Sequence, residues 1–265
     1  DTARRGRVRW GGAIGSEDCN ICAVNRPLPL PNALDALYSA ILVLGSPVLA
    51  YRLLRTGKWR TDWRGRFGHA DVPPPDGRPT VLLHGVSVGE VQAAAPLVER
   101  LAGPGGGTPC RVVVSATTNT GFARARALYG ERHAVVRHPL DFSRSVHRFL
   151  DAVQPDVVAL MELEVWPNFT RACQRRGVPL VVVNGRRSEA SFAGYRRARP
   201  FVSPSFRRLA AVGAQTEDYA KRFSALGVPE ERIRVADWLK WEVGHPGEVH
   251  AGGEPAGQHA QVGVG

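Results

Sequence analysis

Two glutamates carry the strongest candidate chemistry in this sequence, and the first of them is Glu90. It ends the segment HGVSVGE at residues 84–90, in which Ser87 and Gly89 precede it at the expected start of a helix. A carboxylate at that position is stabilised by the helix dipole and can accept a proton from a substrate hydroxyl, so Glu90 is a candidate general base. The alternative is that Glu90 only caps its own helix, and the spacing alone favours this alternative.

The second glutamate, Glu164, lies in the segment ELEVWPN at residues 162–168, which directly follows an apolar run. Trp166 stands two residues further along the chain. An aromatic ring packs on the C–H faces of a sugar while carboxylates bind its hydroxyls, so the pairing is typical of a sugar site. The alternative is that acids at the edge of a sheet are merely solvated.

Other polar side chains follow further apolar runs. Thr117, Thr118 and Gly121 belong to TTNTG at residues 117–121. Small hydroxyl residues and a glycine at a helix N-terminus form a plausible cradle for an anion or a sugar, although an ordinary N-cap needs only one of them. Asn184 and Gln215 end two later runs in the same manner.

Seven short β-branched runs, which alternate with helix-like segments, position these candidates. The runs occupy residues 80–84, 111–115, 134–137, 157–161, 180–184, 209–214 and 232–235, and the helix-like segments residues 91–101, 122–129, 143–153, 168–176 and 218–226. Continuous apolar strands alternating with helices predict βαβ units and a parallel sheet covered on both faces. We therefore predict a Rossmann-like, doubly wound α/β domain over residues 78–240, with the candidate side chains at the carboxyl edge of its sheet.

The net charge is +11, and all 35 Lys and Arg residues precede Trp241. This surplus suits nucleic acid, a phosphate-bearing substrate or an acidic membrane surface. We expect no nucleic-acid partner, because no nucleic-acid motif is present and the densest basic cluster adjoins an apolar helix. Cys19 and Cys22 have metal or redox spacing, but no second Cys/His pair stands at a suitable distance, so we expect reduced thiols and no metal.

The two ends of the chain differ from the predicted sheet domain. Residues 1–35 lack periodicity and an apolar signal-peptide core, so we expect an irregular extension there. Within residues 36–77, sixteen uncharged residues (36–51) precede six cations and two tryptophans, which predicts a helix that lies in an anionic membrane surface. The alternative is a buried core helix followed by a solvated basic loop. The Gly-rich residues 241–265 are expected to be a disordered tail.

Taken in order, these loops resemble those of the Kdo transferases, bacterial enzymes that add 3-deoxy-D-manno-octulosonic acid (Kdo) to a lipid A precursor. The matching blocks are HGVSVGE at 84–90, TTNTG at 117–121, Pro139 with Asp141, ELEVWPN at 162–168, residues 184–191, AQTEDYAKRFSALG at 214–227, and Leu239 with Lys240. The resemblance covers about residues 37–240. Its most specific part is SVGE followed by the E-x-E-V-W-P-N block in that order.

The resemblance implies the N-terminal, acceptor-binding half of a GT-B glycosyltransferase, an inverting and metal-independent enzyme whose active site lies between two Rossmann-like domains. The donor would be CMP-Kdo, the acceptor a lipid A precursor, and no cofactor is implied. Glu90 matches the family's catalytic base, and Glu164 matches a second acid near the acceptor. Arg186 and Lys240 match basic positions that offset phosphate or carboxylate charge. The implied location is the cytoplasmic face of the bacterial inner membrane, peripheral or N-terminally anchored.

The sequence departs from the family pattern at Gly185 and Arg187, and again at residues 236–238, where a Thr-Gly-Asn-like turn is usual. Beyond Glu242 the resemblance stops, so we expect a truncated chain that alone does not transfer Kdo. Two alternatives stay open. One is a non-catalytic, membrane-associated module that binds the acceptor, and the other is a different GT-B enzyme such as a lipid A disaccharide synthase.

The segment 36–67 generates the first testable prediction, which is peripheral binding to anionic bilayers. Flotation with anionic liposomes should recover the protein at low salt and recover less of it at high salt, because salt screens surface charge attraction. Resistance to both salt and carbonate extraction would instead indicate a true membrane span.

Overall fold

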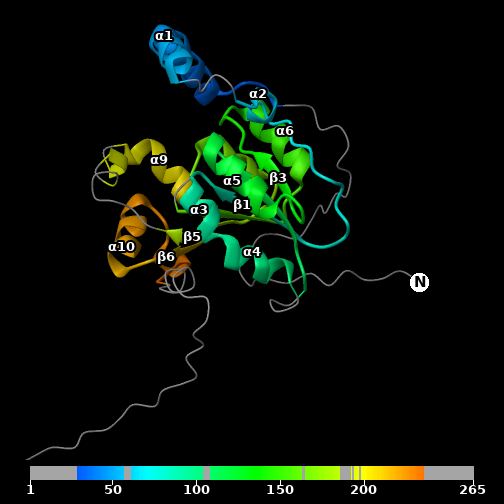
Figure 1. Cartoon of the computed structure of the whole chain (residues 1–265). Helices are drawn as coiled ribbons and strands as arrows, with labels where there is room; N and C mark the ends of the chain where they lie inside the picture. The colour runs from blue at the N-terminus through cyan, green and yellow to red at the C-terminus, as the bar shows by residue number, and fades with distance from the viewer. Residues whose placement is uncertain are drawn as a thin grey trace, which may run out of the picture.

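Seven parallel strands form one sheet in the order β3-β2-β1-β4-β5-β6-β7 (Figure 1). The computed structural model describes residues 29–56, 61–103, 108–162, 165–185, 192, 194–196 and 198–235. The strands are β1 (Thr80–Gly85), β2 (Arg111–Ala116), β3 (Ala134–Arg137), β4 (Val157–Met161), β5 (Leu180–Gly185), β6 (Leu209–Ala214) and β7 (Ile233–Val235). All seven predicted runs are therefore strands, and the doubly wound parallel fold is confirmed.

Helices cover both faces of the sheet. They are α3 (Val88–Ala93), α4 (Ala95–Ala102), α5 (Asn119–Tyr129), α6 (Ser143–Val153), α7 (Pro167–Arg175), α9 (Arg199–Phe206) and α10 (Glu217–Leu226). One core cluster joins α3, α4 and α5 to the sheet, and a second joins α6, α7, α9 and α10 to it. The central strands β1 and β2 are buried along their whole length, which explains why their sequences are continuously apolar rather than alternating.

The structure differs from the prediction at three elements, each for a local reason. The helix expected at residues 91–101 is two helices, because Pro96 at the start of α4 lacks the N–H that would continue α3. Helix α9 was not predicted, since Pro200 and Pro204 interrupt its sequence. Strand β7 begins one residue late because Arg232 ends the short 3-10 helix η2 (Glu230–Arg232).

Helix α1 (Ala33–Thr56) extends away from the sheet domain (Figure 1). Most of its large apolar side chains are exposed: Leu37, Ile41, Leu42, Val43, Leu44, Val48, Tyr51 and Leu54. No single helix within the described ranges is both long and apolar enough to cross a membrane. The two arms Ala33–Leu44 and Ser46–Arg52, bent by 63°, together have the length and composition of a span.

The N-terminal end of α1 is fastened to the sheet domain through Asp35. This buried carboxylate accepts hydrogen bonds from the Ser143 backbone N–H (2.9 Å), from the Ser143 hydroxyl and from the Asn168 amide (3.1 Å). Tyr38 adds a hydrogen bond from its hydroxyl to Asp141 (3.1 Å). Because Ser143 and Asn168 lie at the first turns of α6 and α7, α1 is attached where two core helices begin.

The segment after α1 packs against the sheet domain before residue 78. Helix α2 (Trp63–Arg66) begins at Asp62, whose carboxylate accepts the Gly65 N–H at 2.9 Å. The Arg66 carbonyl accepts the Leu140 N–H at 2.8 Å. Ala70 and Val72 lie against the larger core cluster.

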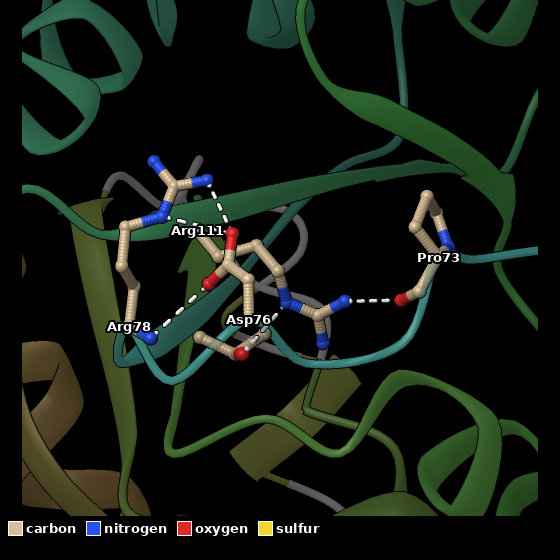
Figure 2. Close-up of polar contacts among 5 residues, drawn as sticks. Pro73, Asp76, Arg78 and Arg111 are labelled. Carbon is tan, nitrogen blue, oxygen red and sulfur yellow. Dashed lines mark hydrogen bonds and ion pairs between the residues drawn. The ribbon is translucent and has the colours of Figure 1, made fainter.

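Arg111 begins β2, at the end of the sheet away from the candidate loops. It connects the turn before β1 to this end of the sheet. Its guanidinium donates to the Pro73 carbonyl at 2.6 Å (Figure 2). It also donates to the Thr80 hydroxyl (3.0 Å) and to the Val153 carbonyl (2.8 Å). Asp76 and Arg78 pair at 2.6 Å beside it, so the Pro-rich segment before β1 is attached to the sheet domain.

Two buried histidines stack beneath the carboxyl edge of the sheet. The rings of His84 and His138 lie 3.8 Å apart between centroids, with 22° between their planes. His84 Nδ1 bonds to Ser115 (2.9 Å to Oγ), whereas His138 Nδ1 has no hydrogen-bond partner within the described part of the chain. Burial lowers the pKa of His84 to about 4 and that of His138 well below its usual value. Both rings are therefore neutral at pH 7.

This stack predicts that the protein loses stability in acid. The folded pKa values lie below the unfolded value of about 6.5, so stability is full above pH 6.5 and falls as the unfolded chain gains protons between pH 6.5 and 4. In His138→Leu we expect the loss of stability as the pH falls below 6.5 to be smaller than in the wild type, as measured by urea unfolding at each pH. Stability at pH 7 should change little, because leucine keeps the apolar volume.

The matched control is His69→Leu, since His69 is exposed. An acid loss in His138→Leu equal to that of the wild type would contradict the assignment of this histidine as a buried neutral group.

Candidate functional site

The sheet order places a topological switch point between β1 and β4. Strand β1 continues into α3 on one face of the sheet, and β4 continues into α7 on the other. Ligands of open α/β sheets bind in the crevice that such a divergence leaves at the carboxyl edge. The loops with Glu90 and Trp166 follow these two strands, so they flank the switch point (Figure 1).

Glu90 is half-buried at the first turn of α3, and both of its carboxylate oxygens are bonded. Its Oε2 accepts the Val86 N–H at 2.9 Å, and its Oε1 accepts the Ser87 hydroxyl at 2.9 Å. The Ser87 oxygen in turn accepts the Glu90 N–H at 3.3 Å, which makes a variant of the capping box in which the carboxylate bonds the N–H of Val86, one residue before the N-cap. Glu90 thus caps its own helix, and this contact also holds the carboxylate at the switch point.

The loop after β2 contacts the loop after β1 through Thr118. The Thr118 hydroxyl donates to the Val86 carbonyl at 2.7 Å and accepts the Gly121 N–H at 3.0 Å. A Cβ atom at Gly121 would lie 2.7 Å from the same Val86 oxygen, so only glycine allows this approach. The predicted group Ser87, Gly89, Glu90, Thr117, Thr118 and Gly121 is therefore brought together in space.

The guanidinium groups of two arginines bond the main chain of the Thr117–Thr118 turn. The sequence did not predict either arginine as part of the site. Arg66 donates to the Thr117 carbonyl, and Arg137 donates to the Thr118 carbonyl at 2.9 Å. Burial, and then the nearby Arg66, lowers the pKa of Arg137. A side chain that bonds a main-chain carbonyl leaves no pattern in the sequence, so no local signal marks these arginines.

The loop after β4 begins with an unusual backbone conformation. Glu162 has a φ of 59°, in the left-handed region that non-glycine residues seldom adopt, and such positions cluster at functional sites. Trp166 stands at the N-cap position of α7 with 41% of its surface exposed, as a ring that contacts a ligand must be. Glu164 lies outside the described residues, so its predicted role is untested.

Asp141, rather than a residue of the loop itself, caps α7. It accepts the Asn168 N–H at 3.0 Å and the Phe169 N–H at 2.8 Å. Burial raises the pKa of Asp141 to about 6, against the opposing effect of these hydrogen bonds. The Pro139–Asp141 block thus fixes the start of α7.

Asn184 and Gln215 lie together at the ends of β5 and β6, further along the same edge. The Gln215 amide donates to the Asn184 side-chain oxygen, and Asn184 has a φ of 58°. The departure at Gly185 has a steric reason, because a Cβ atom there would lie 2.9 Å from the Phe223 ring. Arg186 and Lys240 lie outside the described residues.

In the described ranges no three His, Cys, Asp or Glu side chains form a group able to hold a metal ion. Cys173 is buried and Cys110 is half-buried, and both are free thiols. The Cys19–Cys22 pair lies outside the described residues.

Comparison with known proteins identifies the family. The model for 3-deoxy-D-manno-octulosonic-acid transferase (kdotransferase) matches residues 61–243. A 3-deoxy-D-manno-octulosonic acid transferase from Haemophilus influenzae is 32% identical over 179 residues, covering 68% of this chain and 41% of the relative. The Bordetella pertussis transferase is 34% identical over 199 residues, covering 72% of this chain and 44% of the relative.

A solved UDP-GlcNAc 2-epimerase from Neisseria meningitidis is 13% identical, with a TM-score of 0.43, and covers 59% of this chain and 46% of that one. A likeness of this size does not bear on function. The chain spans somewhat less than half the length of the two transferases. Because the family model covers more than half of its residues, the chain belongs to the 3-deoxy-D-manno-octulosonic-acid transferase family.

Proposed function

We propose that this chain forms the acceptor-binding half of an enzyme that transfers Kdo from CMP-Kdo to a lipid A precursor. The observation that carries the proposal is the position of Glu90, a carboxylate at the switch point of the sheet in a chain of this family. The cytoplasmic face of the inner membrane is the location that fits a lipid acceptor and the exposed apolar side chains of α1.

In the proposed reaction an acceptor hydroxyl oxygen attacks the anomeric carbon of Kdo. The new C–O bond forms as the bond from that carbon to the CMP phosphate oxygen breaks, and CMP leaves with the electron pair. Glu90 takes the hydroxyl proton. The two hydrogen bonds that orient its carboxylate come from Val86 and Ser87, next to it in the chain, so the group is positioned before substrate arrives.

The remaining predicted residues receive binding roles in the same proposal. Trp166 would pack on a sugar face, and the Asn184–Gln215 pair would meet hydroxyls further along the edge. Glu164 would assist at the acceptor, and Arg186 and Lys240 would offset phosphate or carboxylate charge.

A second candidate is a membrane-associated module that binds the acceptor without catalysis. The capping bonds of Glu90 favour it, since they give the carboxylate a purely structural role. A lipid A disaccharide synthase receives no such support, because the family match is to Kdo transferases.

Glu90→Gln separates these two candidates. In a fusion of this chain to the donor domain of a relative, we expect kcat for Kdo transfer to fall by about 10²–10⁴-fold, since general-base catalysis typically contributes that much. Glutamine can keep both capping contacts, accepting from Val86 and donating to Ser87, so the fold and acceptor binding should persist.

The control is Ser87→Ala, which removes the N-cap hydroxyl but leaves the carboxylate. It should lower thermal stability more than Glu90→Gln does, at about 1 kcal/mol for a lost N-cap, and retain more activity. Near-normal turnover of Glu90→Gln would show that Glu90 is only a cap.

A further inference from the structure

A cavity of about 500 Å³ lies at the β3 edge of the sheet, away from the switch point. It is lined by α2 and the residues after it, by the edge strand β3, and by residues of α5 and α6, which lie on opposite faces of the sheet. Its charged lining comprises Arg64, Arg137, Arg148, Asp62 and Asp71. Of the predicted substrate-binding residues that the structure describes, none lines this cavity.

Arg137 is the buried cation of the cavity, with 6% of its surface exposed. Its guanidinium lies 4.1 Å from the centroid of the Phe122 ring and donates through Nη1 to Thr118. Its Nε is buried and has no hydrogen-bond partner among the described residues. The contacts of this guanidinium are to main-chain carbonyls and a ring face rather than to a carboxylate, so an anion that meets the guanidinium in the cavity would stabilise this arrangement.

The charges around the cavity favour an anionic acceptor. Three arginines face two aspartates, and one oxygen of Asp62 already accepts the Gly65 N–H. Arg148 is held in place by donating to the Phe67 carbonyl at 2.6 Å. Arg66 adds a further positive charge close to Arg137. Arginine forks match the oxygens of a phosphate group.

The cavity also adjoins apolar surface. Trp63 and Phe67 are neighbours in the chain of residues that line the cavity. They are 43% and 48% exposed, and their ring centroids lie 6.3 Å apart. Exposed aromatic rings beside arginines are typical of groups that sit at headgroup depth in a bilayer. Helix α1, with its exposed apolar side chains, precedes this segment.

We propose that this cavity binds a phosphate group, and that the group belongs to the headgroup of an anionic membrane lipid. Arg137 on β3 and Arg64 on α2 bind its oxygens, while Trp63 and Phe67 contact the bilayer beside it. Since Arg137 also holds Thr118, the bound headgroup and the loop after β2 share one side chain. Phosphate binding in this cavity does not require sugar transfer at the switch point.

Phosphate binding is tested with inorganic phosphate on the full chain at constant ionic strength, followed by backbone NMR shifts. We expect saturable shifts at residues 62–71 and 135–137. Arg64→Gln should weaken binding about tenfold through the loss of one charged hydrogen-bond donor. Ala152→Leu should abolish it by filling the cavity without changing charge, and Arg100→Gln, an exposed arginine on α4, should leave it unchanged.

The source of the phosphate is tested by flotation with phosphatidylcholine vesicles with and without phosphatidylglycerol. Reduced flotation of Ala152→Leu relative to Arg100→Gln supports the lipid headgroup, because only the cavity has changed. Loss of the phosphate shifts with unchanged flotation overturns the lipid source and assigns the site to a soluble phosphate compound. The absence of saturable shifts in the wild type overturns the site itself. Unchanged thermal unfolding of each variant verifies that it is folded.

Discussion

The parallel direction of all seven strands is the constraint on which the rest of the structure depends. It brings every carboxyl end to one edge, so residues as distant in sequence as Glu90, Trp166 and Gln215 belong to one surface. The order of the strands then sends α3 and α7 to opposite faces, which opens the edge between β1 and β4. The candidate site is a consequence of this topology, and the loops supply its chemistry.

The strands could be predicted because burial on both faces leaves a direct record in the sequence. A strand such as β2 is buried along its whole length, and its run of three valines at residues 112–114 shows this without reference to any partner, although Arg111 and Ser115 beside the run are polar. Helix α9 left no such record, since its prolines contradict the usual helical composition and its formation depends on Phe206 packing against Phe223. Local rules therefore succeed where burial dictates composition and fail where a tertiary contact overrides propensity.

The contacts of the candidate site also divide into a local one, which the sequence predicts, and long-range ones, which it does not. The capping box of Ser87 and Glu90 is a local device, and the spacing of the two residues predicts it. The contacts that hold the site together are long-range: Thr118 to Val86, Arg137 to Thr118, and Asp141 to the start of α7. Their partners are main-chain atoms, which every residue carries, so no residue type marks them in the sequence.

These long-range contacts also join α1 and α2 to the loops that flank the switch point. Asp35 ties α1 to Asn168, within the block that contains Trp166, and Arg66 ties α2 to Thr117, beside the loop that contains Glu90. These two contacts attach α1 and α2 to the two loops that flank the switch point. In the proposed membrane association, the direction in which α1 leaves the domain would determine how the carboxyl edge faces the lipid surface. The buried carboxylate of Asp35, bonded to the first turns of α6 and α7, makes that direction a property of the core.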